Sequence, residues 1–344
     1  MSNVELYRYL LKYVLTEDQL LNLGYPVESA LYPGKAIIYK AQDAQVTYYR
    51  SDLRNFFQHK RGGFEMAEHL YGSDQAQFCT GQHPPLSPSL EKRCVRCGKG
   101  FFVTLDGEYL TEESCTYHWG RWKPLDNDRF GYSCCERSEN DLGCSVNKLH
   151  VWTGVNSGMN GPLNDYIRTK KLRHPQYNVY ALDCEMCYTG KGLELCKLTV
   201  VGIDGCLVYE TLVKPHRSIV DYNTRFSGLN VNNLGKATKR LRDVQNDLMG
   251  FINGETILIG HGLENDLRAL GLLHSNVIDT AVLFPHYYGL PFRRSLKSLV
   301  SAHLQREIQT RLDGHDSFED ARACVELVLW KVCCELRRKS EHLP

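Results

Sequence analysis

The stretch Tyr180-Ala-Leu-Asp-Cys-Glu-Met186 places two carboxylates inside an otherwise largely apolar run. Alternate residues of a β-strand point to the same face, so Asp183 and Glu185 are expected to project together, opposite Cys184 and Met186. Two neighbouring carboxylates repel each other, and an unpaired charge is costly to bury. The stretch therefore predicts a strand whose acidic pair is neutralised by a divalent cation.

Three further residues extend this acidic pair. Asp266 follows a Gly-His-Gly turn and is expected near the start of a helix, and His315 precedes Asp320, which opens a terminal helix expected over 317–336. Carboxylate oxygens suit Mg²⁺ or Mn²⁺, and two such ions roughly 3.5–4 Å apart can hold the oxygens of a phosphoryl displacement. A neutral imidazole beside them can take a proton from an attacking water. The set thus predicts metal-assisted hydrolysis.

Each of these residues alone also has a simpler explanation. An Asp-x-Glu pair on a strand is usually a solvated face, and a lone loop histidine such as His315 is usually a surface residue. Asp320 is placed to form a capping box with Ser317 at the start of the terminal helix. The catalytic interpretation depends on all of them occurring together, in this order.

Composition limits the classes of protein to which the chain can belong. It has 344 residues, enough for two or three domains, and its 41 Lys and Arg nearly balance its 40 Asp and Glu. A nucleic-acid surface would therefore be local. No apolar run of about 18 residues predicts a membrane span, and the N-terminus lacks a secretory pattern. We expect a protein of the nucleus or cytoplasm, not secreted, whose fourteen cysteines are reduced thiols or metal ligands.

The chain divides into four expected parts. Residues 1–82 are expected to form a small α+β module, with a helix over 4–15, a capping box at 16–19 and a strand over 45–49. Residues 90–155 form a cysteine- and histidine-rich region, and 156–176 a linker. Strands expected over 178–186, 196–203 and 206–213, and helical spacing over 234–252, predict an α/β domain with a mixed sheet over 177–340.

The cysteine- and histidine-rich region has metal-ligand spacing. Its eight candidate ligands are Cys94, Cys97, Cys115, His118, Cys134, Cys135, Cys144 and His150. Thiolate-rich sets favour Zn²⁺, and eight ligands suffice for two closed tetrahedral structural sites, although one site is also compatible with the spacing. The pairing of ligands stays open, but adjacent Cys134 and Cys135 are expected to serve different sites. The alternative is a set of buried reduced thiols without metal.

The order of the acidic residues resembles that of the DEDDh class of 3′→5′ exonucleases, which have Asp-x-Glu, then Asp, then His-x4-Asp. The flanking segments look like the RNA exonuclease 1 (Rex-type) family over roughly residues 177–335. These segments are Leu182-Asp-Cys-Glu-Met186, Ser227-Gly228, Gly260-His-Gly-Leu-Glu-Asn-Asp-Leu267, Val277-Ile-Asp-Thr280 and Arg294-Ser-Leu-Lys-Ser-Leu299. The region ahead of them is similar to the cysteine- and histidine-rich segment of some Rex-type proteins and to the CHORD pattern.

This resemblance implies an RNase H-like fold and a 3′→5′ exoribonuclease acting by two metal ions. It implies two Mg²⁺ (or Mn²⁺) ions held by Asp183, Glu185, Asp266 and Asp320, with His315 as general base and 5′-mononucleotides as products. Single-stranded RNA 3′ ends would be the binding partner, with a protein partner possible through the N-terminal region. The alternatives are a DNA exonuclease of the same chemistry and a non-catalytic RNA-binding scaffold.

Further residues have expected roles near the catalytic set. In relatives, the position of Met186 packs beside the terminal nucleotide. Arg293, Arg294 and Lys297 form a basic cluster that could hold backbone phosphates, or equally a solvated helix end. Asp279 matches a family-typical acid, and its place after a short strand predicts support of the sheet edge rather than a metal ligand.

Overall fold

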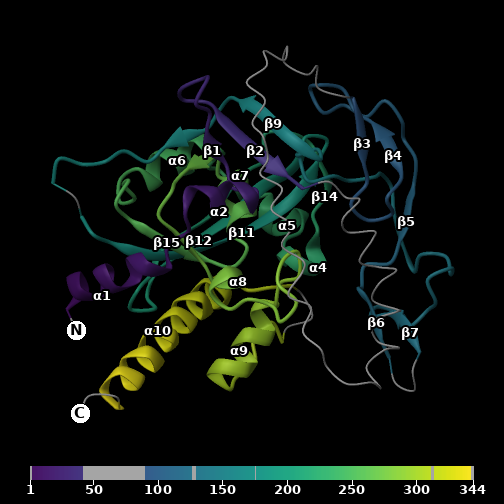
Figure 1. Cartoon of the computed structure of the whole chain (residues 1–344). Helices are drawn as coiled ribbons and strands as arrows, with labels where there is room; N and C mark the ends of the chain where they lie inside the picture. The colour runs from purple at the N-terminus through teal and green to yellow at the C-terminus, as the bar shows by residue number, and fades with distance from the viewer. Residues whose placement is uncertain (1, 42–89, 126–128, 175, 311–313, 342–344) are drawn as a thin grey trace.

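The computed structural model describes residues 2–41, 90–125, 129–174, 176–310 and 314–341 (Figure 1). The strand predicted over 45–49 lies outside the described residues. So does the second half of the predicted module at 1–82.

A six-stranded mixed sheet forms the centre of the molecule. Its order is β13-β12-β11-β15-β17, with β14 also paired to β11. The first three strands are antiparallel, whereas β11, β15 and β17 run parallel. The bounds are β11 (Val179–Thr189), β12 (Gly192–Gly202), β13 (Leu207–Leu212), β14 (Ile219–Asp221), β15 (Ile257–Gly260) and β17 (Val277–Asp279). The predicted mixed sheet is confirmed.

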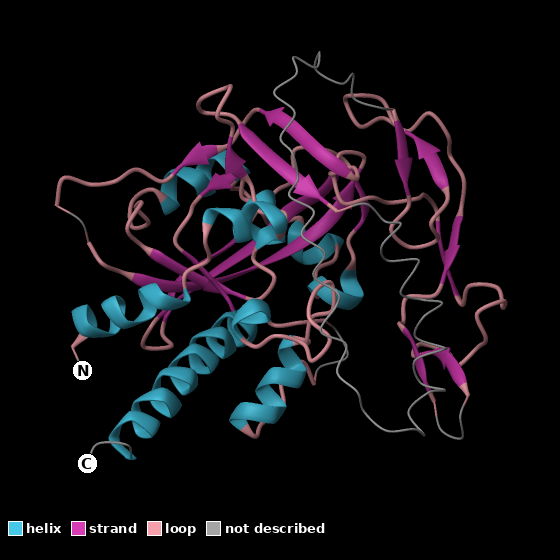
Figure 2. Cartoon of the chain, viewed as in Figure 1, coloured by secondary structure: helices cyan, strands magenta, loops and turns pink. Residues whose placement is uncertain are grey.

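Helices cover both faces of this sheet (Figure 2). They are α4 (Thr224–Ser227), α5 (Val231–Leu234), α6 (Leu241–Leu248), α7 (Glu264–Ala269), α8 (Thr280–Leu283), α9 (Leu296–Leu304) and α10 (Ser317–Glu341). The helical spacing over 234–252 corresponds to two helices rather than one, since α5 ends at Leu234 and α6 begins at Leu241. In the described part of the chain, no helix combines the length and apolar character that a membrane crossing requires.

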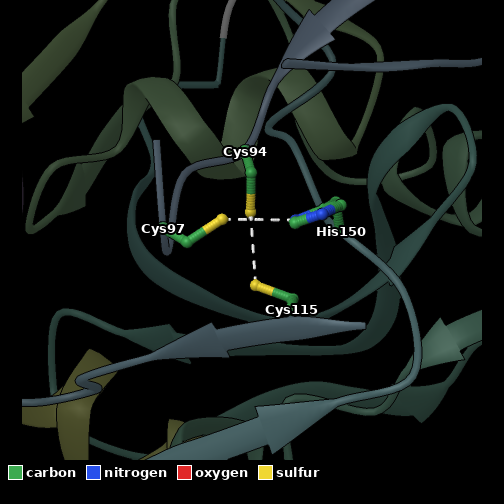
Figure 3. A group of neighbouring side chains, drawn as sticks. All are labelled: Cys94, Cys97, Cys115 and His150. Carbon is green, nitrogen blue, oxygen red and sulfur yellow. Dashed lines mark hydrogen bonds between the residues drawn. The ribbon is translucent and has the colours of Figure 1, made fainter. Parts of the chain in front are cut away.

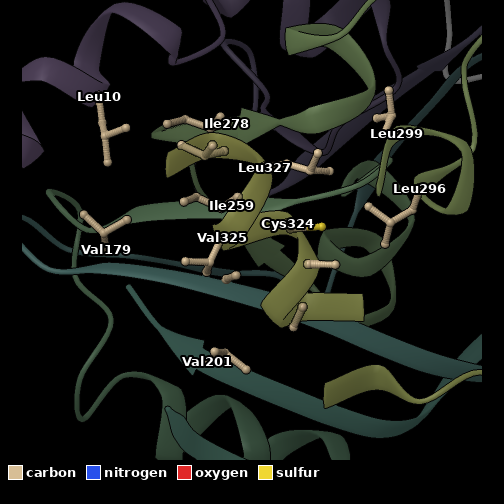
Figure 4. Close-up of a cluster of buried hydrophobic side chains, with 14 of the residues drawn as sticks. Leu10, Val179, Val201, Ile259, Ile278, Leu296, Leu299, Cys324, Val325 and Leu327 are labelled. Atoms are coloured by element: carbon tan, nitrogen blue, oxygen red, sulfur yellow. The ribbon is translucent and has the colours of Figure 1, made fainter. Parts of the chain in front are cut away.

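Strand residues alternate between two hydrophobic cores. Ile257 and Ile259 of β15 face a core that α9 and α10 cover, and Figure 4 shows Ile259 there beside Cys324 and Val325 of α10. Leu258 points the other way, into a core shared with α6 and α7. This period of two is the expected side-chain pattern of a strand buried on both faces.

The described part of the N-terminal segment, residues 2–41, packs onto the central sheet and joins its two cores. It contains α1 (Asn3–Leu10), the 3-10 helix η1 (Leu11–Tyr13), α2 (Glu17–Asn22), β1 (Val27–Glu28) and β2 (Ala36–Lys40). The capping box of Thr16 with Gln19 opens α2 as predicted. Leu10 joins the first core, while Leu20 and Tyr25 join the second. Helices this short bury too little apolar surface to be stable alone, so they require the larger domain.

The segment predicted as a linker, residues 156–176, contains two paired strands. β9 (Gly158–Leu163) pairs with β2, and β10 (Ile167–Arg168) pairs in parallel with β16 (Leu272–Leu273). The linker prediction is therefore wrong for these residues. They carry the Gly, Pro and Asn content of a loop, and their strands form because partners distant in the sequence satisfy their backbone groups.

The cysteine- and histidine-rich region consists of short hairpins and loops. The strand pairs are β3 (Glu91–Arg93) with β4 (Gly100–Phe102), β5 (Cys115–Tyr117) with β8 (Ser145–Asn147), and β6 (Trp122–Pro124) with β7 (Phe130–Tyr132). The region contacts the domain of the central sheet through Trp152, whose Nε1 donates to the Gly190 carbonyl at 2.9 Å, and through an ion pair of Arg96 with Asp221. These contacts fix it against the β11–β12 end of the sheet.

Tyr25→Phe should lower the free energy of unfolding by about 1–2 kcal/mol, because the buried Tyr25 hydroxyl donates to Asp279 Oδ2 at 2.8 Å. Urea unfolding followed by circular dichroism measures the loss. Tyr287→Phe is the matched control, since the Tyr287 side chain is 77% exposed and should change stability by less than about 0.5 kcal/mol. Equal stabilities of the two variants would contradict this anchoring role for Tyr25.

Candidate functional site

The carboxyl ends of the parallel strands bring the first carboxylates together. Ala181 of β11 is in register with Ile259 of β15, so Asp183 lies just past the point where β15 ends and the chain turns toward α7. Asp266 projects from α7, and its Oδ1 accepts a hydrogen bond from the Cys184 backbone N at 2.8 Å. Asp266 is thereby held against the backbone between Asp183 and Glu185.

The four predicted carboxylates form one electrostatic group. Glu185, Asp266 and Asp320 are buried, and Asp183 is half-buried. Burial raises the pKa of Asp183 well above its usual range, and Asp266, Glu185 and Asp320 raise it further. Burial also raises the pKa of Glu185, with Asp320 adding to it. So many buried acids cannot all be ionised unless a cation compensates them.

Two buried carboxylate oxygen atoms without a hydrogen-bond partner support a cation site. Glu185 Oε1 and Asp320 Oδ1 are fully buried and have no hydrogen-bond partner among the described residues. A buried acceptor without a donor loses the solvation it had in water. The donor set consists of carboxylate oxygens, which fits Mg²⁺ or Mn²⁺. The residues present therefore fit the divalent ions predicted from the sequence.

His315 lies at the edge of this acidic group. Its backbone N donates to the Phe226 carbonyl at 2.8 Å, and its ring meets the Phe226 ring edge-on, with centroids 6.1 Å apart. Its Nδ1 is 3.7 Å from Asp320 Oδ2. Burial, together with the positive charge of Lys297, lowers the pKa of His315. The imidazole is thus neutral near pH 7 and can accept a proton.

Asp320 does not act as the capping partner of Ser317. The Ser317 hydroxyl lies 2.7 Å from Thr199 Oγ1, on the neighbouring strand β12. Asp320 Oδ2 instead accepts a hydrogen bond from Gln309 Nε2 at 2.9 Å. The terminal helix therefore directs Asp320 toward the acidic group.

The sequence did not indicate that Gln309 and Lys197 support the site, and for Asp279 it indicated only a general role. Gln309 orients Asp320 from an irregular loop, and no spacing in the sequence signals it. Lys197 lies opposite Glu185 in the β11–β12 register, which its position in the predicted hairpin could have indicated. Asp279 supports the sheet edge as predicted, because its Oδ1 accepts from Gly262 N at 2.9 Å and from Ala281 N at 2.8 Å. Asp279 thus fixes the turn that leads to Asp266.

The structure places the four predicted substrate residues differently from one another. Met186 is partly exposed. Arg293 pairs with buried Glu264 at 2.7 Å, and Arg294 Nη1 lies 3.4 Å from His303 Nε2. Lys297 is close enough to His315 to affect its pKa. Lys297 also lies 3.8 Å from Glu307 Oε2, but its side chain is 45% exposed, and it is the one of these three cations whose charge affects the pKa of His315.

The first cluster of candidate zinc ligands comprises Cys94, Cys97, Cys115 and His150 (Figure 3). Their ligand atoms all lie within 4.8 Å of one another. Cys94 Sγ is 3.7 Å from Cys115 Sγ, and Cys97 Sγ is 3.2 Å from His150 Nδ1. Cys94 and Cys97 come from the β3–β4 hairpin, Cys115 begins β5, and His150 lies three residues after the end of β8. These four side chains converge on a common centre.

The second cluster comprises His118, Cys134, Cys135 and Cys144. Its ligand atoms likewise lie within 4.8 Å of one another, and Cys144 Sγ is 3.5 Å from Cys134 Sγ. The prediction that Cys134 and Cys135 serve different sites is wrong. A tight turn makes this possible, since Glu136 N donates to the Tyr132 carbonyl at 2.7 Å and Glu136 has φ 58°.

The structure groups each histidine with other cysteines than the order of these residues in the sequence suggests. His118 follows Cys115 by three residues but joins the later cysteines, and His150 joins the earlier ones. Tetrahedral coordination with Zn–S bonds of about 2.3 Å separates sulfur atoms by about 3.8 Å. The sulfur separations of 3.5–3.7 Å match this spacing and far exceed a disulfide bond of about 2.05 Å. Both clusters therefore fit zinc.

Comparison with known proteins agrees with this geometry. Residues 180–328 match the Exonuclease (RNase_T) family, so the chain contains an exonuclease domain, and this family uses divalent metal ions. RNA exonuclease 3 of Eremothecium gossypii is 35% identical over 76% of this chain and 70% of its own length. The chain belongs to the RNA exonuclease family, as the sequence motifs predicted.

Other relatives match more of this chain but are much longer proteins. The human putative exonuclease GOR is 40% identical over 100% of this chain and 45% of its own length. The human RNA exonuclease 1 homolog is 40% identical over 96% of this chain and 24% of its own length. The chain thus spans less than half the length of these curated relatives. Among solved structures, the Pan2 catalytic unit of Neurospora crassa covers 52% of this chain and 32% of its own, with 23% identity and a TM-score of 0.43.

Asp183→Asn should remove most of the stabilisation that Mg²⁺ gives, because it removes a carboxylate ligand from the acidic group. For an intact site, free metal at about one hundred times its Kd adds about 2.7 kcal/mol to the free energy of unfolding. Thermal unfolding with and without Mg²⁺ measures this gain. Asp106→Asn, at a side chain that is 79% exposed, should keep it. A full gain in Asp183→Asn would disprove the ligand assignment.

Elemental analysis of paired variants tests the exchange of histidines. The unaltered protein, and the exposed Cys206→Ser control, should hold about two Zn per chain. Cys94→Ser with His150→Ala damages one cluster and should leave about one Zn, whereas Cys94→Ser with His118→Ala damages both clusters and should leave almost none. The reverse result would assign His118 to the first cluster.

Proposed function

We propose that this chain is a 3′→5′ exoribonuclease that hydrolyses phosphodiester bonds from a free RNA 3′ end and releases nucleoside 5′-monophosphates. The observation that carries the proposal is the buried acidic group of Asp183, Glu185, Asp266 and Asp320, with neutral His315 at its edge. Membership of the RNA exonuclease family supports both the chemistry and the choice of RNA.

The residues of the chain have separate tasks in this reaction. Two divalent ions, when bound by the four carboxylates, would stabilise the charge that develops on the phosphate and activate water. His315 accepts the proton of the attacking water, since its pKa is lowered and its side chain is 37% exposed. Lys297 lies nearby as a positive charge for the substrate phosphates.

We also propose that the protein binds two structural zinc ions, one in each cysteine–histidine cluster. The cysteine clusters support them because their ligand atoms already have tetrahedral spacing, and a region with so small a core gains stability from metal. The cysteines of the described residues are all free, which agrees with a proposed location in the reducing nucleus or cytoplasm.

One assay distinguishes the proposed function from its two alternatives, a DNA exonuclease and a non-catalytic RNA-binding scaffold. A 5′-labelled single-stranded RNA and a DNA of the same sequence are incubated with the protein and Mg²⁺, alongside an EDTA control and an RNA with a blocked 3′ end. We expect stepwise shortening of the RNA from its 3′ end, slower loss of the DNA, and no reaction with EDTA or the blocked end.

Two other results of this assay would each favour a different function. Faster loss of DNA would favour a DNA exonuclease. An unreactive protein that still binds RNA would favour a non-catalytic scaffold. Asp266→Ala should abolish hydrolysis, because it removes a buried carboxylate of the acidic group, and unchanged activity in this variant would disprove the site assignment.

A further inference from the structure

A large hollow separates the cysteine- and histidine-rich region from the nuclease sheet. Its volume is about 1240 Å³, and both regions line it. Small-molecule sites are typically about 300–1,000 Å³ and mostly apolar. This hollow is larger, and arginines and aromatic rings line much of it. Its size and lining suit an extended polymer better than a small ligand.

The lining of this hollow includes a residue that also contacts the active site. Phe226 is 41% exposed, lines the hollow, and meets the ring of His315 edge-on. Arg225, its neighbour on α4, places its guanidinium 3.9 Å from the centroid of the Trp119 ring. Trp119 belongs to the cysteine- and histidine-rich region and is 37% exposed. The hollow therefore borders the proposed general base through Phe226, and it extends to Trp119 of the cysteine- and histidine-rich region.

The charge of the hollow is positive on balance. Its lining contains five cations, Lys40, Arg93, Arg96, Arg121 and Arg225, and three acids, Glu139, Asp141 and Asp221. One of the acids is already neutralised, because Arg96 forms an ion pair with Asp221. A chain that is nearly neutral overall thus has a net positive lining in this hollow.

We infer that this hollow binds the single-stranded RNA that lies upstream of the 3′-terminal nucleotide in the acidic site. Aromatic faces and guanidinium planes are the surfaces on which unpaired bases stack, and nearby cations hold the phosphates. Trp119, Arg225 and Phe226 supply the stacking surfaces, and Arg121 supplies charge further along. This inference deepens the proposed function, since that function sets the direction of the strand.

The first experiment measures binding without turnover. The full chain carrying Asp183→Asn is titrated with a 5′-fluorescein single-stranded RNA of about 12 nucleotides, and fluorescence anisotropy gives the Kd. Adding Trp119→Ala should weaken binding about 10-fold, because one stacking platform is lost. Adding Arg121→Ala should lower the slope of log affinity against log salt by about 0.7.

Matched controls lie in the same region but away from the hollow. Phe102→Ala removes an aromatic ring that is 43% exposed, and Lys99→Ala removes an exposed cation. Neither residue lines the hollow, so both variants should keep the affinity and salt dependence of the parent. The zinc content of every variant is measured, so that loss of folding is recognised. Arg121→Ala, at an exposed side chain, gives a second measurement if Trp119→Ala loses zinc.

Activity separates failure of this inference from failure of the proposed function. In the catalytically intact chain, Trp119→Ala should reduce the ratio of kcat/KM for the long RNA to that for an RNA of about 3 nucleotides by about 10-fold. Unchanged Kd, salt slope and ratio in active protein would overturn the inference and leave the exonuclease intact. Weakened binding in a protein that degrades no RNA would support the hollow and overturn the exonuclease.

Discussion

The mutual repulsion of buried carboxylates is the constraint on which the rest of this structure depends. Asp183, Glu185, Asp266 and Asp320 come from β11, α7 and α10, and burial together with their neighbours raises the pKa of Asp183. Left to themselves, such groups would separate or take up protons. The fold prevents separation by attaching each acid to an element that is packed in the core. The resulting site has buried oxygen atoms without a hydrogen-bond partner among the described residues, and a divalent cation would compensate their charge.

The supporting contacts reach well beyond the acidic residues. Asp279 accepts hydrogen bonds from Gly262 and Ala281, and thus fixes the turn before Asp266, while Tyr25 of the N-terminal segment donates to the same carboxylate. Gln309 performs a similar task for Asp320. The N-terminal segment is therefore part of the structure that positions the site, which explains why its helices are buried in the two cores of the nuclease domain.

The cysteine- and histidine-rich region is joined to the same framework. Its two ligand clusters are interleaved along the chain, so the two zinc sites proposed for them would fix the relative positions of its hairpins. Trp152 and Arg96 then attach it to the sheet near β14, beside α4. Because α4 also holds His315 through the Phe226 carbonyl, the same short helix borders both the site of chemistry and the hollow in front of it.

The sequence by itself predicted the exonuclease family and much of the fold of its domain. The strand that carries Asp183 and Glu185 and the start of α2 at Thr16 are local patterns, and the structure places both as predicted. The structure also brings His315 to 3.7 Å from Asp320. Only the tertiary structure decided which histidine joins which cysteines, that residues 156–176 contain paired strands, and that Trp119 meets Arg225. Local spacing determines which face a residue occupies, whereas these contacts join residues far apart in the chain and depend on how the separate elements pack.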